Sequence, residues 1–290
     1  FQTDVITFMK EPNFFCGGPP KSGTTFLQRI LDSHPDIGCS SEDDLQKLLN
    51  SFIELHKSYN DKLLRVGQRI GAKNVPLVES KVFENLLFNL ISDISSNRNQ
   101  GKKLIGISDN DFLLSNIIPI LKCYINTKVI IIFRNPIDTA LSAWDSNHRL
   151  YKKENHPAHL EIMKIDGKLD IDKYTIETTK NWNNTVQNFI KKIEIAPERV
   201  LIVTYESLVL NKKNILTKIL KFIDCRYNDK IILDMVNNSS IDKMRDSSSR
   251  PDFFSKGRLS FGKNELKAET IKSSIKMSED NLDILNIKFN

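Results

Sequence analysis

A glycine-rich loop near the N-terminus constrains the fold more than any other feature of the chain. The loop spans residues 17–25, reads GGPPKSGTT and follows the apolar run Phe14–Cys16. Beyond it, apolar residues recur at helical spacing from Leu27 to Leu31. A strand, a glycine-rich turn and a helix in this order can hold a phosphate on the backbone amides of the helix N-terminus. An ordinary strand–turn–helix unit is the alternative.

Short apolar runs alternate along the chain with longer segments of helical periodicity. This alternation favours an α/β fold, a single domain over residues 1–290 with a mostly parallel central sheet flanked by helices. Such sheets bind ligands beyond the carboxyl ends of their strands. We predict strands at residues 13–17, 103–107, 128–133 and 200–203, and helices at 25–33, 44–57, 83–95, 112–124, 137–149, 174–193 and 213–223.

The loop departs from the nucleoside-triphosphate loop G-x-x-x-x-G-K-[ST] in one respect. Gly18 and Gly23 have the required separation, and Thr25 occupies the hydroxyl position. Thr24 stands where that loop has its lysine, and the lysine comes three residues earlier, at Lys21. A cation at this place can reach a bridging oxygen beyond the bound phosphate. The loop is therefore P-loop-like, but its lysine lies within the loop and not at the position next to the second glycine.

A second anion site is predicted where the strand at residues 128–133 passes into a helix. Asn135 suits the N-cap, Pro136 the first helical position and Asp138 the first turn. Arg134 at the strand end and Ser142 on the helix can together hold a phosphate, the arginine through its planar guanidinium. The alternative is a surface arginine near a helix cap and an incidental serine.

Both strings resemble motifs of the PAPS-dependent sulfotransferases, where PAPS is 3′-phosphoadenosine 5′-phosphosulfate. Residues 20–25 resemble the 5′-phosphosulfate loop, and R-N-P-x-D-x-x-x-S-x-W resembles the 3′-phosphate motif. The resemblance implies PAPS as sulfuryl donor and PAP as product, with no metal. It implies that Lys21 contacts the bridging oxygen and leaving phosphate. It places the 5′-phosphate on Ser22, Gly23, Thr24 and Thr25, and the 3′-phosphate on Arg134 and Ser142.

Two further segments resemble this family more loosely. Residues 205–208 are similar to its Y-E-x-L segment, which implies that Tyr205 approaches the nucleotide; packing on the next helix is the alternative. Residues 254–262 resemble the C-terminal R-K-G-x-x-G element, although a serine precedes the lysine and a phenylalanine precedes the last glycine. Lys256, Gly257 and Arg258 are therefore candidate nucleotide ligands, unless this is a solvated basic loop.

Sulfuryl transfer needs a base for the acceptor's proton, a role that a carboxylate or histidine can fill. Glu42 lies 21 residues after Lys21, the spacing of the glutamate in the tyrosylprotein and bacterial branch that the chain resembles most closely. An acidic helix cap formed with Asp43 and Asp44 is the alternative. His156 and His159 are further candidates. Relatives of this branch often carry a second lysine about 26 residues before the arginine, whereas residues 106–111 contain none.

Charge and composition exclude other classes. An excess of 42 basic over 36 acidic residues suits an anionic ligand, but the cations are dispersed, so we expect no nucleic-acid partner. The longest apolar run, residues 129–133, is too short for a membrane span. Cys16, Cys39, Cys123 and Cys225 lack CxxC spacing, which predicts free thiols and favours a cytoplasmic location.

The predicted function is transfer of a sulfuryl group from PAPS to a hydroxyl or amine of an acceptor, expected to be a small molecule. An atypical P-loop kinase or NTPase and a non-catalytic nucleotide-binding module are the alternatives. The polar stretch 151–173 is a long surface insertion and candidate lid, and residues 246–263 are a candidate nucleotide-closing segment. The oligomeric state is open.

Overall fold

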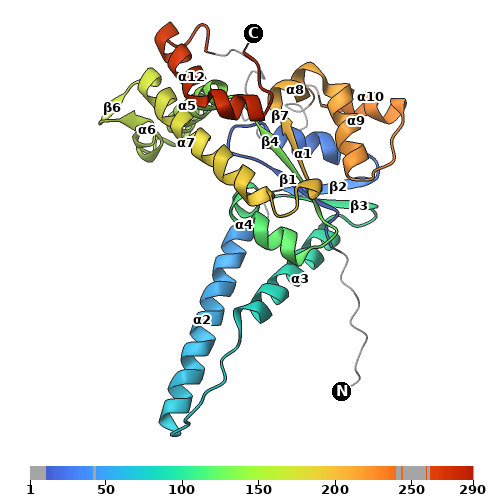
Figure 1. The fold of residues 1–290 in the computed structure, drawn as a ribbon, viewed down its shortest axis with the longest axis vertical. Helices are drawn as coiled ribbons and strands as arrows, with labels where there is room; N and C mark the ends of the chain where they lie inside the picture. The colour runs from blue at the N-terminus through green and yellow to red at the C-terminus, as the bar shows by residue number, and fades with distance from the viewer. Residues whose placement is uncertain (1–10, 42–43, 240–242, 244–258, 260–261, 290) are drawn as a thin grey trace.

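A five-stranded parallel sheet forms the centre of the computed structural model, with helices on both faces (Figure 1). The structure describes residues 11–41, 44–239, 243, 259 and 262–289. The strand order is β2-β3-β1-β4-β7, and every neighbouring pair is parallel. The predicted α/β fold is confirmed. The strands are β1 (Phe14–Gly17), β2 (Ile37–Ser41), β3 (Leu104–Ser108), β4 (Lys128–Phe133) and β7 (Val200–Thr204).

The strands are buried on both faces, which explains why they read as continuous apolar runs. In β4, Ile131 and Phe133 enter the core on one face, while Ile130 and Ile132 enter the core on the other. All four side chains are fully buried. An alternating apolar–polar pattern would have left one face of this sheet open to water, so the unbroken run itself requires helices on both sides.

Each core is completed by its own set of helices. The first core takes residues from α2 (Leu45–Arg69), α3 (Ser80–Arg98), α4 (Asn110–Cys123), α7 (Ile171–Ile193) and α12 (Ala268–Ile284). The second takes residues from α1 (Thr24–Asp32), α8 (Tyr205–Leu210), α9 (Lys212–Phe222) and α10 (Asp229–Asn238). The four cysteines are free, as predicted, and all but Cys123 are buried. None of the described helices is long and apolar enough to cross a bilayer.

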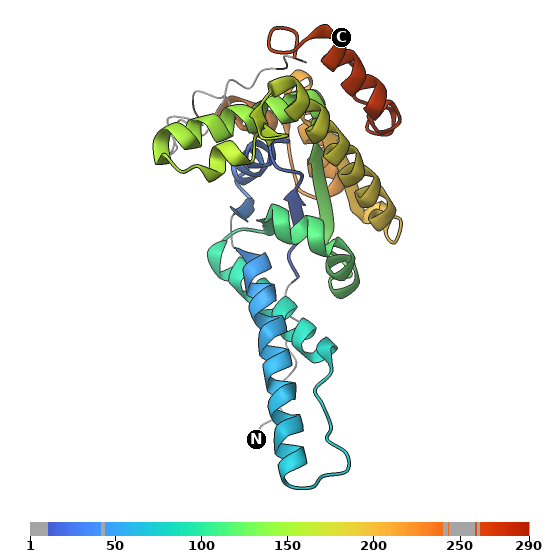
Figure 2. The same ribbon diagram turned by 90° about the vertical axis from the view of Figure 1, so that its left-hand side faces the viewer.

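Helices α2 and α3 form an arm that projects from the body of the molecule (Figures 1 and 2). The helix predicted to end at residue 57 runs on to Arg69, so the predicted boundary was wrong. The extension contains no proline, and its first glycine is Gly67; leucine, lysine and arginine, which favour helix, fill much of it. Beyond residue 57 the helix has no core of its own chain to face, and Gly67 is its only buried residue there.

The candidate lid at residues 151–173 contains regular elements in place of a long irregular loop. Helix α5 (Pro136–Glu154) continues into it, followed by α6 (Ala158–Glu161) and a hairpin of β5 (Lys164–Ile165) and β6 (Lys168–Leu169). Met163 is fully buried against Ala140 of α5 and Tyr174 of α7. The segment is thereby fixed to the two helices that flank it. A short 3-10 turn, η1 (Pro197–Arg199), precedes β7.

Candidate functional site

Those predicted site residues that the structure describes converge at one edge of the sheet. Because all five strands are parallel, their carboxyl ends share this edge. Lys21 follows β1, Arg134 follows β4 directly, and Tyr205 follows β7 directly. The Arg134 guanidinium carbon lies 4.6 Å from the centre of the Tyr205 ring, which also packs against Gly23. The two motifs found in the sequence therefore meet in space.

Two glycines allow the phosphate loop (residues 17–25) to pack closely on its neighbours. A Cβ on Gly18 would lie 2.1 Å from the carbonyl oxygen of Ile132 in β4. Gly23 has φ of 93°, and a Cβ there would lie 2.4 Å from the Tyr205 ring. Both positions require glycine, the second also for its left-handed backbone. The loop is consequently pressed between β4 and Tyr205.

The N-terminus of α1 offers donors to an anion. Gly23 is its N-cap and supplies no side-chain acceptor to the first-turn amides, which have no intrahelical partner. Beside them, the fully buried Ser22 Oγ has no hydrogen-bond partner among the described residues. Thr24 is buried and Thr25 is half-buried at the start of the helix. A phosphate would satisfy these groups together, so the residues present fit the 5′-phosphate of PAPS.

Asn110, the first residue of α4, ties the phosphate loop together and was not predicted from the sequence. Its Oδ1 accepts a hydrogen bond from the Gly18 backbone N–H (3.2 Å), and its Nδ2 donates to Thr24 Oγ1 (3.4 Å). The segment 106–111, where related enzymes often have a lysine, thus contributes an amide that spans the loop. The available signal was the Asp109-Asn110 pair after a strand, which is typical of a helix start.

Lys21 reaches from the phosphate loop to α5. Its Nζ donates a hydrogen bond to Ser146 Oγ (2.8 Å), and its backbone has φ of 68°. Burial lowers the pKa of Lys21 from its usual value, and the positive charge of Arg149 lowers this pKa further. Ser142 lies one helical turn before Ser146, so the two serines share a face of α5. Ser142 is half-buried on the face that meets the phosphate loop.

Arg134 is held from three directions. Its side chain forms an ion pair with Asp138 one turn later (3.4 Å) and lies over the Tyr205 ring, and the whole residue is only 8% exposed. Its carbonyl oxygen accepts a hydrogen bond from Trp182 Nε1 of α7 (2.9 Å). The predicted cap is confirmed, since Asn135 Oδ1 accepts from the Asp138 backbone N–H at 2.8 Å. The arginine is therefore fixed in place by the described residues around it.

Glu206 supports this second site and was not predicted as a site residue. Its Oε1 accepts hydrogen bonds from the Asn135 backbone N–H (2.9 Å) and from Asn135 Nδ2 (2.8 Å). Burial raises the pKa of the Glu206 carboxyl, and the hydrogen bonds from Asn135 oppose that shift. The acid therefore links the start of α8 to the start of α5. Its signal was its place beside Tyr205 in the Y-E-x-L segment.

Four predicted site residues, Glu42, Lys256, Gly257 and Arg258, lie outside the described residues. Ser41, just before Glu42, and Asp44, two residues after it, are described. Asp44 makes no side-chain cap to α2; the Leu45 backbone N–H donates instead to Asp109 Oδ2 (2.8 Å). On the C-terminal side, Gly262 packs against Ile137 in the first turn of α5. The end of the candidate closing segment therefore lies near Arg134.

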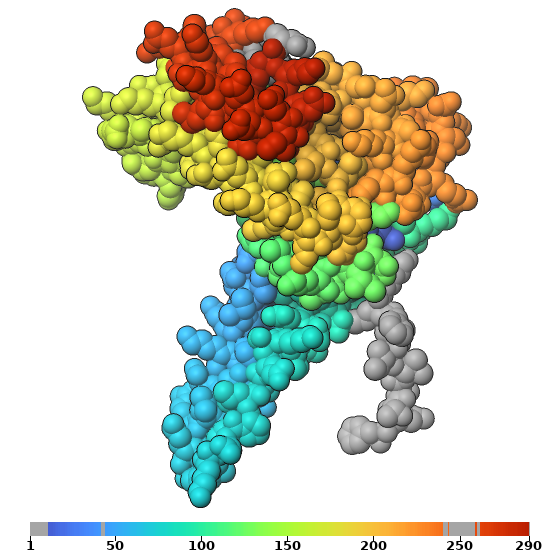
Figure 3. Space-filling view, viewed as in Figure 1, coloured from blue at the N-terminus to red at the C-terminus, as the bar shows by residue number. Residues whose placement is uncertain are grey.

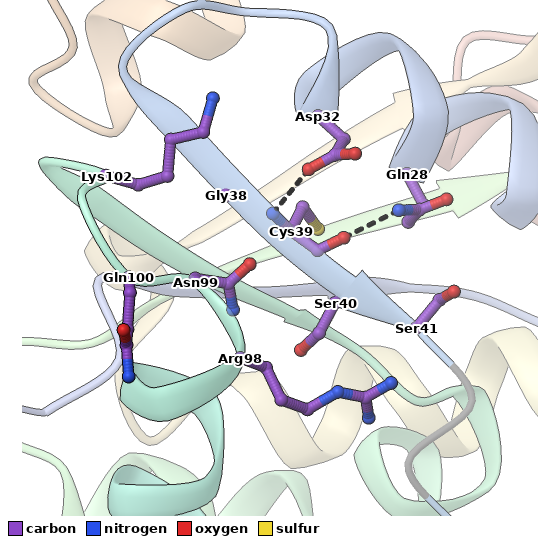
Figure 4. Close-up of a pocket in the computed structure, with 10 residues that line it drawn as sticks. All are labelled: Gln28, Asp32, Gly38, Cys39, Ser40, Ser41, Arg98, Asn99, Gln100 and Lys102. Atoms are coloured by element: carbon purple, nitrogen blue, oxygen red, sulfur yellow. Dashed lines mark hydrogen bonds between the residues drawn. The ribbon is translucent and has the colours of Figure 1, made fainter.

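A depression of about 410 Å3 lies beside β2, away from the phosphate loop (Figure 4). Side chains of α1 cover the outer edge of this strand: Gln28 Nε2 donates to the Cys39 carbonyl (2.6 Å), and Asp32 Oδ1 accepts from the Cys39 backbone N–H (2.9 Å). The edge is thereby blocked against pairing with another strand. The other residues that line the depression are Gly38, Ser40, Ser41, Arg98, Asn99, Gln100 and Lys102.

The chain is similar in sequence to proteins of known family. The sequence model of the Sulfotransferase family matches residues 12–229. Protein-tyrosine sulfotransferase A of Caenorhabditis elegans is 26% identical over 224 residues, 76% of this chain and 52% of the relative. Protein-tyrosine sulfotransferase 1 of Danio rerio is 23% identical over 221 residues, 76% of this chain and 55% of the relative. The chain spans about half the length of these curated relatives.

Solved structures share the fold. A mouse sulfotransferase, SULT7A1, solved in complex with PAP, superposes with a TM-score of 0.57 at 17% identity, covering 96% of this chain and 87% of its own. A sulfotransferase from Alicyclobacillus acidocaldarius gives a TM-score of 0.51 at 14% identity, covering 97% and 98%. The family match extends over most of the chain and includes both anion sites from Lys21 to Tyr205. This chain belongs to the sulfotransferase family.

Proposed function

We propose that the protein transfers the sulfuryl group of PAPS to an acceptor hydroxyl. One observation carries the proposal: a phosphate loop has its cation, Lys21, on the loop itself and joined through α5 to a second, buried cation, Arg134. A nucleotide with phosphates at both its 5′ and 3′ positions matches two such sites. Family membership and the fold shared with a PAP-bound sulfotransferase support this donor.

The donor is assigned to the described residues by their chemistry. The first-turn amides of α1, with Ser22, Thr24 and Thr25, would hold the 5′-phosphate, and Asn110 keeps the phosphate loop in shape. Arg134 and Ser142 would hold the 3′-phosphate. Tyr205, whose ring already contacts both Gly23 and Arg134, would sit between the two phosphates. Lys256, Gly257 and Arg258 are proposed to complete the 3′ side.

Bound PAPS supplies a sulfuryl group on a good leaving group. Lys21 neutralises the negative charge that grows on the phosphate as the sulfur–oxygen bond breaks. Glu42 takes the proton of the acceptor hydroxyl as the new sulfur–oxygen bond forms. No other proton acceptor is needed, and PAP leaves with the electron pair of the broken bond.

For the acceptor, the relatives, which are protein-tyrosine sulfotransferases, favour a tyrosyl hydroxyl in a polypeptide over the small molecule expected from the sequence. Both are hydroxyl acceptors, and the same base serves either. An acceptor panel with a tyrosyl peptide, a simple phenol and an alkyl alcohol separates them. Sulfation of the peptide alone supports the polypeptide acceptor, whereas sulfation of the free phenol at equal efficiency favours the small molecule.

A kinase or NTPase is the competing function, and the described residues give it less support. Such an enzyme needs a magnesium-binding acid near the end of a strand. Asp109, next after β3, instead accepts hydrogen bonds from the Phe112 and Leu45 backbone N–H groups. Glu206, after β7, accepts from Asn135. ATP hydrolysis measured beside protection by PAPS in a thermal-shift assay distinguishes the two functions.

Substitution of the proposed base tests the mechanism and separates it from mere binding. Glu42→Gln keeps size and polarity but cannot take the proton, so kcat should fall about 10²–10⁴-fold while PAP affinity stays nearly unchanged. Transfer of radiolabelled sulfate and calorimetric titration with PAP measure the two quantities. A variant with normal turnover removes Glu42 from the role of base.

Asp44→Asn is the matched control, because Asp44 is exposed and makes no side-chain cap to α2. It should leave kcat within about twofold. His156→Ala and His159→Ala form the second control, since His159 pairs with Glu154 and His156 accepts from the Ala158 backbone N–H. Loss of activity in a histidine variant, with activity kept in Glu42→Gln, would assign the base to the 151–173 segment. Undetectable transfer in wild type, with PAP still bound, would favour the non-catalytic module.

A further inference from the structure

The arm of α2 and α3 carries an unusual load of exposed apolar side chains. It projects from the body in both ribbon views and stands clear of it in the space-filling view (Figures 1, 2 and 3). More than half of the exposed large apolar side chains of the described residues lie between positions 53 and 86. They are Ile53, Leu55, Tyr59, Leu64, Val66, Ile70, Leu77, Val82 and Leu86.

The inner face of α2 is already occupied by the returning limb of the arm. The His56 ring lies 4.8 Å from the ring of Phe83 in α3. The Asn60 side chain exchanges hydrogen bonds with the backbone of Val78, and a Cβ on Gly67 would meet Val75. Positions 56, 60 and 67 therefore form the contact within the arm. The exposed apolar residues need another explanation.

A second stripe runs along α2 with the spacing of a coiled coil. Positions 48, 52, 55, 59, 62, 66 and 69 alternate in steps of four and three, the a/d repeat of a heptad. Leu55 is 56% exposed, Tyr59 47% and Val66 37%. Phe52, at the root of the stripe, is half-buried because one side of its ring packs against the core of its own chain. Lys62 and Arg69 are exposed along the stripe. We call Phe52, Leu55, Tyr59, Lys62, Val66 and Arg69 the arm stripe.

We propose that the arm stripe pairs with the arm stripe of a second copy of this chain, in antiparallel register. Pairing about a two-fold axis between positions 60 and 61 places Leu55 opposite Val66 of the other copy. The same register places Tyr59 opposite Lys62, and Phe52 opposite Arg69. Each cation then faces an aromatic ring, a favourable contact, and each aliphatic residue faces another. The stripe is self-complementary, as a two-fold interface requires.

The size of such an interface is sufficient for a stable dimer. The part of α2 that lies beyond the core, residues 53–69, is about 25 Å long, and the two limbs of the arm are together about 20 Å wide. Contact along one such face from each copy removes roughly 1,000 Å2 of surface in total, which is about the area that a specific protein–protein interface needs. Both limbs carry exposed apolar residues, including Val82 and Leu86 on α3.

The proposed pairing of two arm stripes is tested by measuring the mass of the 290-residue chain in solution. Sedimentation velocity at micromolar concentration should give a dimer for the wild-type chain. Leu55→Asp with Val66→Asp should raise the dissociation constant of the dimer by about 100-fold or more, because two apolar contacts become buried charges. Far-ultraviolet circular dichroism should not change, since both side chains are exposed in one copy. Tm should fall only by the stabilisation that dimer formation supplies.

Ile53→Asp with Leu64→Asp is the matched control. These residues are 56% and 39% exposed on the same helix, and each lies about 200° around the helix from Leu55 and Val66 respectively. This pair should remain dimeric. Equal loss of the dimer in both double variants, or a monomeric wild type, would overturn the proposal. A monomeric wild type that binds anionic lipid vesicles through Leu55 and Val66 would assign the stripe to a membrane surface instead.

Crosslinking tests the register. In a Cys123→Ser background, Leu55→Cys with Val66→Cys should form a disulfide-linked dimer under mild oxidation, because the two positions face each other across the axis. Within one copy they are 11 residues apart on α2, about 16 Å, too far for a disulfide. Leu55→Cys alone should crosslink poorly. Crosslinking of that single variant as efficiently as the pair would indicate a parallel arrangement and overturn the antiparallel one.

Discussion

The two cations of the site are held in contrasting ways. Lys21 sits on a loop, is partly exposed, and its Nζ donates to a neutral hydroxyl, that of Ser146. Arg134 is buried, forms an ion pair with Asp138, and lies against the ring of Tyr205. The hydrogen bond to Ser146 is a weak restraint that a phosphate can replace, whereas the contacts of Arg134 fix its direction before any ligand arrives.

The difference between the contacts of Lys21 and those of Arg134 suggests different roles, Lys21 in catalysis and Arg134 in nucleotide binding. A group that stabilises charge in the transition state must meet that charge as it develops, which suits the ammonium group of Lys21. A group that only recognises a fixed phosphate gains most from being held in advance, which suits Arg134. We therefore expect losses at Lys21 to appear in turnover and losses at Arg134 to appear in affinity. The predictions below test that division.

Of the substitutions that compare the two cations, Lys21→Ala is expected to have the largest effect. Because the lysine is assigned to charge that develops on the leaving phosphate, kcat should fall about 10²–10³-fold. PAP affinity should change little, since PAP carries no sulfuryl group. Transfer assays at saturating PAPS and calorimetric titration with PAP measure both quantities. Near-normal kcat would make Lys21 a binding residue and remove the contrast with Arg134.

Arg134→Ala should show the opposite pattern. Loss of a buried, charge-assisted contact of roughly 1.5–3 kcal/mol corresponds to a rise of about 10- to 150-fold in the Kd for PAP. The variant should also lose its preference for PAP over AMP, which lacks the 3′-phosphate. Asp138→Asn is a control that keeps the arginine and weakens its ion pair, so it should lower affinity less. Unchanged discrimination between PAP and AMP would place Arg134 outside the binding site.

The same contrast should be visible as a pH dependence. Burial and Arg149 lower the pKa of Lys21, so this lysine loses its charge as pH rises through a value below 10.5. On the alkaline side, kcat/KM for PAPS should fall by up to about tenfold per pH unit, because it reports the free enzyme.

Lys21→Arg is the control for that titration, since an arginine does not lose its charge there. Its activity will be lower, but its profile should lack the alkaline decline. The pKa of Tyr205 is raised by burial, so this phenol does not titrate earlier than usual. An identical decline in wild type and Lys21→Arg would assign it to another group.

The residues of the candidate nucleotide site could be picked out from the sequence because they lie in short local strings along the chain. The phosphate loop and the Arg134–Ser142 string are local patterns, and a parallel sheet brings the ends of β1 and β4 together. Strand β4 was predicted at its observed bounds. Strand β2 was not among the strands predicted from the residue pattern, because Gly38, Ser40 and Ser41 make it a short and weakly apolar strand at the sheet edge.

The residues that were not predicted contact partners that are far away in the sequence. Asn110 reaches Gly18 over 92 positions, and Lys21 reaches Ser146 over 125. No local pattern marks such contacts, since asparagine at a helix start has an adequate capping explanation of its own. The last helix, α12, was missed because its buried face is largely polar, with Thr270, Ser274, Ser278 and Asn281. Helix α10 was not predicted either; of its residues only Ile232 and Met235 are buried.

The smallest predicted effect concerns Ser146. If the Lys21–Ser146 hydrogen bond must open before Lys21 can meet the phosphate, Ser146→Ala should strengthen PAPS binding. A neutral partner of this kind is worth about 0.5–1.5 kcal/mol, so KM for PAPS should fall about two- to tenfold with little change in kcat. Ser146→Thr keeps the hydroxyl and serves as control. A rise in KM in the alanine variant would show that Ser146 itself holds the nucleotide. The hydrogen bond from Lys21 to Ser146 would then support nucleotide binding, as the ion pair of Arg134 with Asp138 does.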